Sequence, residues 1–210
     1  MIKETNLEFS NTLTRRTRTS SIVVHHGAGS VEETAESYHS MHLRRGWTGL
    51  GYHYVIEWDG TIKRGRPEWA TGAHSRPVNA TSIGICLIGD FTRHNPSEAQ
   101  IKSLVWLIGD IWSRHPETVL AGHRDTDATL CPGHLFPWDR VKLELIEGVL
   151  NMIPVESWMI NGGKEAVQAL CDKGLINTPE KWSDDDVLTN TMPAGLVFIL
   201  LNRIAEYGGK

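Results

Sequence analysis

The sequence is poor in cysteine, in long hydrophobic runs and in excess positive charge, and each shortage excludes a class of protein. Three cysteines among 210 residues are too few, and odd in number, for a disulfide framework. The longest apolar run, Leu196 to Leu201, is far too short to cross a bilayer. Residues 1–20 contain arginines but no hydrophobic stretch, so no secretory signal is expected there.

The charge balance argues against nucleic acid and anionic membranes as the main partners. The chain has 21 basic and 25 acidic residues, a formal net charge of −4 and an isoelectric point near 6.2. Hydrophobic residues at 40% and charged residues at 22% are values typical of a globular protein. The sequence therefore predicts a folded protein that neither binds nucleic acid nor inserts into a membrane. Histidine and tryptophan are abundant, with ten and eight residues respectively.

The hydrophobic pattern predicts an α/β fold with a mixed central sheet flanked by helices. Short β-branched runs that end in turns indicate strands, and apolar residues at helical spacing behind capping boxes indicate helices. The expected strands are residues 21–26, 51–58, 61–64, 82–89 and 118–121. The expected helices are a segment capped by Ser30 and Glu33 that ends at Gly46, a segment behind Ser97 and Gln100, and residues 138–150.

A domain boundary is predicted at Pro154. It separates residues 1–153 from a small α-helical module, residues 154–210, with helices expected at 164–173 and from Pro193 to Gly208. A segment this short makes a marginal core of its own. We therefore expect it to pack on the main domain or on another copy of the chain.

Metal-binding side chains occur at the ends of predicted strands. His25 and His26 close the first strand, His123 follows the strand 118–121, and Cys131 lies in a loop eight positions later. Imidazole together with thiolate selects zinc, and three protein ligands leave the open position that catalytic zinc requires. The alternative is that the histidines are structural and the cysteine is inert. The residues alone leave both interpretations open.

Seven short motifs follow one another along the chain. They are Ile22-Val-Val-His25, His42-x-x-x-Gly46-Trp47, Gly51-Tyr-His-Tyr54, Asp59-Gly60-Thr61, Gly72-Ala-His74, Ser82-Ile-Gly-Ile-Cys-Leu-Ile-Gly89, and Gly122-His123 with Cys131-Pro132. In this order, over about residues 20–150, they resemble the zinc N-acetylmuramoyl-L-alanine amidases of the phage-lysozyme and peptidoglycan-recognition-protein type, the amidase-2 family. The resemblance implies zinc-dependent hydrolysis of the amide bond between N-acetylmuramic acid and L-alanine in bacterial peptidoglycan.

The resemblance also implies roles for single residues near the metal. His25, His123 and Cys131 match the zinc ligands, and His26 is expected to be a neighbour rather than a ligand. Tyr52 matches a tyrosine beside the metal whose hydroxyl can donate to the developing oxyanion.

Two of these assignments have alternatives. Tyr52 can instead be a half-buried strand aromatic that shares one face with Tyr54 and Ile56. Thr129 matches a position where the phage branch has a catalytic lysine and the recognition-protein branch often has threonine. Its hydroxyl can donate to an oxyanion but carries no charge, so Thr129 is the second catalytic candidate.

Five residues are predicted to contact the substrate. His53 and His74 match histidines that line the peptide-binding cleft, and Trp47, Arg76 and Asn79 are candidates for a groove that takes stem peptide and sugar. Each can instead be a plain surface or core residue. Because no glutamate stands in a His-Glu-x-x-His arrangement, a thermolysin-like endopeptidase does not fit.

The C-terminal segment more weakly resembles one unit of a surface-layer-homology-type wall-binding module, or the helical tails of clostridial-type lysins. Wall targeting or homodimer formation is one interpretation of it, and a structural appendage is the other. We expect a phage or prophage endolysin, made in the cytoplasm without a signal peptide and acting on the cell wall after release at lysis. The alternatives are a noncatalytic peptidoglycan-binding protein on the same fold, which has no need of Cys131, and a cytoplasmic recycling amidase for soluble muropeptides.

Overall fold

The structure, a computed structural model, describes residues 1–150. The chain divides into two compact units, Met1–Val141 and Lys142–Lys210. Among the elements that the structure describes, the first unit contains the whole sheet and the first two α-helices. The predicted boundary at Pro154 and the two predicted helices beyond it lie outside the described residues.

The first unit is built on a mixed sheet of six strands, in the order β1-β4-β3-β5-β2-β6. Only β3 and β4 pair antiparallel, through the predicted hairpin, and all other neighbours pair parallel. The strands are β1 (Ile2–Lys3), β2 (Ser21–His26), β3 (Tyr54–Ile56), β4 (Ile62–Arg64), β5 (Ser82–Leu87) and β6 (Val119–Gly122). Every residue of β5 is buried, which confirms it as a central strand.

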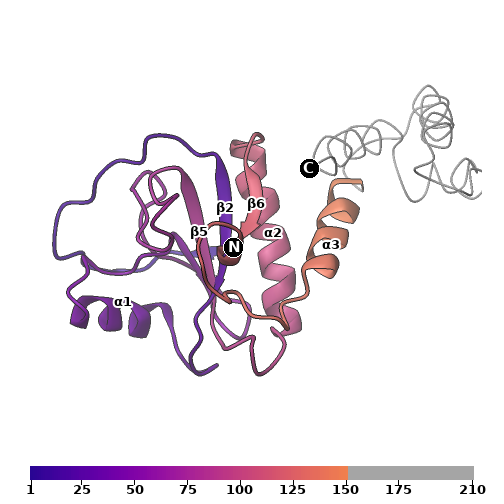
Figure 1. Ribbon diagram of the computed structural model, residues 1–210, viewed down its shortest axis with the longest axis horizontal. Helices are drawn as coiled ribbons and strands as arrows, with labels where there is room; N and C mark the ends of the chain where they lie inside the picture. Colours follow the sequence, from indigo (N-terminus) through magenta and orange to yellow (C-terminus); the bar gives the residue numbers. More distant parts are fainter. Residues whose placement is uncertain (151–210) are drawn as a thin grey trace, which may run out of the picture. The chain divides into compact units, whose positions relative to one another are not determined.

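Helices cover both faces of this sheet. Helix α1 (Ala35–Arg44) and helix α2 (Glu98–Arg114) lie on opposite sides of it (Figure 1). A 3-10 helix, η1 (His123–Asp125), directly follows β6, and α3 (Trp138–Leu150) matches the predicted third helix. The α/β class with a mixed, helix-flanked sheet is therefore confirmed. Within the described part of the chain, no helix combines the length and the apolar character needed to cross a membrane.

The first helix begins later than the sequence predicts. Its N-cap is Thr34, whose side chain accepts from the Ser37 N–H in a capping box. The predicted cap, Ser30, instead accepts from the N–H of Glu32 within a turn. Two nearby serine and threonine caps compete for one helix start, and the sequence alone did not separate them. The predicted end is confirmed by Gly46, which has a φ of +78° just past the helix.

The second predicted strand is shorter than expected, because regular pairing in β3 covers only Tyr54–Ile56. Just before it, Tyr52 packs against the core cluster that contains Val55. Adjacent strand residues face opposite sides of a sheet. Tyr54 does not belong to that cluster, and its hydroxyl donates to Glu68 at 3.0 Å. The expectation that Tyr52, as a strand aromatic, would share a face with Tyr54 and Ile56 is therefore wrong.

The topology brings the predicted metal ligands to one edge of the sheet. His25 and His26 end β2, and His123 comes immediately after β6. Because β2 and β6 are parallel neighbours, their carboxyl ends meet at the same edge. In open α/β sheets this is the edge where ligands usually bind.

Candidate metal centre

Three side chains that the sequence predicts as metal ligands converge at the carboxyl end of β2. One ligand atom from each of His25, His123 and Cys131 lies within 4.8 Å of the other two. The Cys131 Sγ is 3.8 Å from the His25 Nδ1, and the two imidazole centroids are 4.4 Å apart. Zinc bonds of about 2.0–2.3 Å put a nitrogen and a sulfur ligand about 3.5 Å apart on one tetrahedral ion. The three side chains therefore stand close to the spacing of zinc ligands.

His123 supplies the strongest local sign of a missing partner. Its Nε2 is buried without a hydrogen-bond partner, and no other side-chain nitrogen or oxygen in the described residues is so placed. The Asp127 carboxylate is 3.9 Å away, beyond hydrogen-bond reach. Buried polar atoms nearly always have partners. A metal cation at this point would satisfy the nitrogen, so the donor set fits the ion.

Burial sets the protonation states of the three side chains. It lowers the pKa of His25 well below the usual value, with His123 and His26 adding to the effect, and it also lowers the pKa of His123. Both rings are therefore neutral near pH 7, as metal ligation requires. Burial raises the pKa of the Cys131 thiol to about 11, against the opposing effect of the His26 backbone N–H. The thiol thus needs a cation beside it to become a thiolate at neutral pH.

His26 contributes its backbone rather than its ring to this cluster. The His26 N–H donates to the Cys131 Sγ at 3.3 Å. Its imidazole Nδ1 instead accepts from the Phe91 N–H at 3.0 Å. Successive strand residues point to opposite faces, so the rings of His25 and His26 serve different sides of the sheet.

The two catalytic candidates lie in different surroundings. The Tyr52 ring is partly buried, with its centroid 5.1 Å from that of His25. Burial raises the pKa of Tyr52 well above its usual value, so the phenol keeps its proton and can donate it in a hydrogen bond. Thr129 is exposed, and its hydroxyl accepts from the Cys131 N–H at 3.2 Å. That hydrogen bond stabilises the loop that carries Cys131. It leaves the Thr129 hydroxyl proton available to another acceptor.

The two predicted cleft histidines are buried. His74 lies against the cluster of candidate ligands, with its Nδ1 3.0 Å from the His25 Nε2. His53 is fully buried: its Nε2 bonds the Ala70 carbonyl and its Nδ1 accepts from the Gly84 N–H, both at 2.9 Å. Because both nitrogens of His53 are already bonded to backbone, its position indicates support of the site from inside. Substrate contact by either histidine stays a prediction.

The other predicted substrate residues lie in loops and turns between the regular elements. The Asn79 Oδ1 accepts from the N–H groups of His74 and Ser75, at 2.8 and 2.9 Å, and so shapes the loop that carries His74. Arg76 in the same loop is exposed. Trp47 is 43% exposed, and its ring lies 4.5 Å from that of His42. Trp47 therefore offers an open aromatic face.

His42 connects that aromatic face to the catalytic candidate. Its ring centroid is 5.9 Å from that of Tyr52, and its Nδ1 accepts from the Gly51 N–H at 3.2 Å. A run of neighbouring rings therefore ends at the cluster of candidate ligands: Trp47, His42, Tyr52 and His25.

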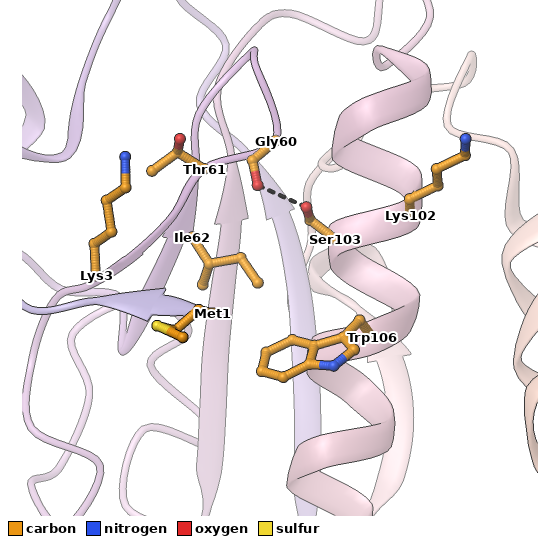
Figure 2. A pocket seen from close by; sticks show the side chains of 8 residues that line it. All are labelled: Met1, Lys3, Gly60, Thr61, Ile62, Lys102, Ser103 and Trp106. Atoms are coloured by element: carbon orange, nitrogen blue, oxygen red, sulfur yellow. Dashed lines mark hydrogen bonds between the residues drawn. The ribbon is translucent and has the colours of Figure 1, made fainter.

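A hollow lies away from this centre, between α2 and the β1–β4 edge of the sheet (Figure 2). The Trp106 side chain projects from α2 toward Met1 and Ile62 there. The eight lining residues are Met1, Lys3, Gly60, Thr61, Ile62, Lys102, Ser103 and Trp106. Because they include no histidine, cysteine or carboxylate, this hollow lacks the groups needed for metal-assisted hydrolysis.

Two supports of the cluster are absent from the sequence-based prediction. The backbone N–H of His26 carries no sequence signal, because any residue offers the same donor. Ser82 is wholly buried at the start of β5, with its Oγ 3.4 Å from the His74 Nε2. Its only sequence signal is a polar residue that opens an otherwise apolar strand.

Comparisons with known proteins identify the family and the fold. Residues 15–134 match the family described as N-acetylmuramoyl-L-alanine amidase. The chain is 33% identical to the endolysin of Klebsiella phage KP32 over 126 residues, covering 57% of this chain and 83% of that protein. It is 32% identical to the endolysin of Escherichia phage T7 over 125 residues, with coverage of 56% and 83%. Among solved structures, it is similar to the endolysin N-acetylmuramoyl-L-alanine amidase LysCS from Clostridium intestinale URNW. That match has a TM-score of 0.67 and 36% identity, and it covers 69% of this chain and 95% of the other.

Proposed function

Because this chain belongs to the N-acetylmuramoyl-L-alanine amidase family and is a peptidoglycan amidase of the endolysin kind, we propose that it works with zinc held by His25, His123 and Cys131. The observation that carries the proposal is the convergence of these three ligand atoms within 4.8 Å, around a buried His123 Nε2 that has no other partner. Two imidazoles and one thiol are a donor set that favours zinc over harder cations.

The chemistry follows from what each group can do near the scissile amide. When bound, zinc polarises the carbonyl group and lowers the pKa of water at its open position. Tyr52 keeps its proton and donates a hydrogen bond to the oxygen on which negative charge develops. Thr129 offers a second, uncharged donor from the ligand loop. The products are the lactyl carboxylate of N-acetylmuramic acid and the free amine of L-alanine.

The substrate is proposed to lie along the loops around the cluster. Trp47 has an exposed ring face suited to a sugar or an apolar part of the stem peptide. Arg76 is exposed and can pair with a stem-peptide carboxylate. Asn79, His74 and His53 complete the predicted set, with contacts that hold the loop and the ligand ring in place.

We further propose that the chain reaches its substrate at lysis, as an endolysin made in the cytoplasm. The support is the similarity to two phage endolysins, of which this chain covers 83% each. The C-terminal module, residues 154–210, is proposed to add wall targeting or to join two copies of the chain.

Mass spectrometry of digested cell walls tests the cleavage site. The proposal predicts new free amino groups on L-alanine and intact glycan strands. New reducing sugar ends, or amino groups at other stem-peptide positions, would contradict it. Cleavage of soluble muropeptides without clearing of intact walls would favour the recycling alternative instead.

A further inference from the structure

One nitrogen of His25 belongs to a line of buried hydrogen bonds that leads away from the ligand cluster. The His25 Nε2 lies 3.0 Å from the His74 Nδ1, and the His74 Nε2 lies 3.4 Å from the Ser82 Oγ. The Ser82 Oγ in turn lies 2.7 Å from the carbonyl oxygen of Val78. His25, His74 and Ser82 are 1%, 9% and 0% exposed, so water has little access to the line.

The final contact fixes the direction of all the others. A carbonyl oxygen can only accept, so the Ser82 hydroxyl donates to Val78. The Ser82 Oγ is then an acceptor, and the His74 Nε2 must carry the hydrogen. A neutral imidazole has one N–H and one lone pair. The His74 Nδ1 therefore accepts from the Nε2–H of His25, and the lone pair of His25 is on Nδ1.

That lone pair is on the nitrogen that metal ligation requires. The His25 Nδ1 is the ring atom 3.8 Å from the Cys131 Sγ. In the reverse arrangement Ser82 would donate to His74, and the His25 Nδ1 would carry a hydrogen pointed at the cluster. A cation could not bind to that nitrogen, and Val78 would lose its short hydrogen bond.

The neighbouring backbone is shaped to admit the middle ring of the line. A Cβ at Gly84 would lie 2.5 Å from two carbons of the His74 ring, and a Cβ at Gly72 would lie 2.5 Å from one of them. Contacts this close are not tolerated between carbon atoms. The two glycines therefore leave the space that His74 fills between His25 and Ser82.

We propose that Ser82, anchored on the Val78 carbonyl, sets the tautomer of His25 through His74 and so prepares this ligand before the metal arrives. The inference rests on the proposed function, since it takes His25 to be a metal ligand. Ser82 and His74 act as positioning residues, through another side chain. Partners that orient a ligand imidazole in this way commonly change metal affinity or activity by about 10–100-fold when removed.

The test compares Ser82→Ala with a matched control, Ser103→Ala. Ser103 also donates its hydroxyl to a backbone carbonyl, that of Gly60 at 2.6 Å, in the remote hollow of Figure 2. Nitrogen-15 spectra of the histidine rings in the metal-free proteins report which nitrogen carries the hydrogen. Titration with zinc against a competing chelator reports affinity without any assay of activity.

The expected wild-type spectrum has the hydrogen on Nε2 in both His25 and His74. Ser82→Ala should give mixed tautomers and zinc binding weaker by about tenfold, while Ser103→Ala should match the wild type in both. A wild-type hydrogen on the Nδ1 of either ring would overturn the inference. Because this spectrum is recorded on the wild type, it tests the inference even if Ser82→Ala does not fold. Unchanged tautomers in Ser82→Ala, at any zinc affinity, would also overturn it. A wild-type protein that shows the expected tautomers but binds no zinc would instead refute the proposed metal site.

Discussion

The backbone N–H of His26 donates to the Cys131 Sγ at 3.3 Å and joins two residues 105 positions apart in the chain. At the end of β2, His25 thus contributes its imidazole ring to the cluster, and His26 contributes its backbone N–H. Because a hydrogen bond from backbone N–H favours the thiolate form of cysteine, the pair helps to prepare the sulfur for a cation. Adjacent histidines therefore have separable roles.

Alanine at each of these two positions should separate the roles. His25→Ala removes a ligand and should abolish zinc binding and amidase activity. His26→Ala keeps the backbone donor and should retain zinc. It should lose about 1–3 kcal/mol of unfolding free energy, since the Phe91 N–H is left unpaired. Zinc content by atomic emission and urea unfolding check both variants, and the reverse pattern of zinc loss would show that His26 is the ligand.

Tyr52→Phe should leave the metal in place and slow the reaction. The hydroxyl is the only group removed, and a single donor to a developing oxyanion contributes about 10²–10³-fold to turnover. Zinc content should stay at the wild-type level, because Tyr52 is not among the three ligand residues. The measurement is kcat on a soluble muropeptide, and turnover within about twofold of the wild type would remove Tyr52 from the mechanism.

Acid should weaken the fold through two buried histidines outside the ligand set. Burial lowers the pKa of both His42 and His53 to about 4. Between about pH 6.5 and pH 4 these two side chains are therefore protonated in the unfolded chain but neutral in the folded chain. Their contribution to the free energy of unfolding is fully present above about pH 6.5. It is lost as the pH falls, by up to about 3 kcal/mol for each residue.

Urea unfolding of the chelator-treated protein at pH 7 and pH 4.5 measures this loss. The His53→Gln variant is the control, since it removes one of the buried rings whose pKa is lowered and should show a smaller difference between the two pH values. Equal unfolding free energies at both pH values in the wild type would contradict the assignment.

Deletion of residues 154–210 tests the proposed role of the C-terminal module. If the module targets the wall, the shortened chain should cleave soluble muropeptides at the wild-type rate but sediment less with purified walls. If it joins two copies, the full chain should be a dimer in solution and the shortened chain a monomer. Unchanged sedimentation with walls and an unchanged number of copies would leave only the role of a structural appendage.

The regular parts of the fold follow closely from the sequence. The buried strands β2 and β5 and the capped helix α2 agree with their predicted positions, because apolar period and capping chemistry act locally. The start of α1 and the conformation at Tyr52 differ from prediction. Both depend on which of several local hydrogen-bonding options the tertiary contacts select.

The candidate site likewise has a part that the sequence predicts and a part that it does not. The residue types at the ends of β2 and β6 predict His25 and His123 as neighbours, since parallel strands end at one edge. The link from His25 through His74 to Ser82 is not visible in the sequence. It depends on ring orientations across residues far apart in the chain, and no local pattern encodes them.

The most direct test of the central claim is Cys131→Ser, with zinc content and wall cleavage measured on the same preparation. The wild type should hold about one zinc per chain, as expected for a single three-ligand site, and should release free L-alanine amino groups from purified walls. The serine variant should lose both, because a neutral hydroxyl replaces the thiolate ligand. Wall cleavage at the wild-type rate by a zinc-free serine variant would contradict the account.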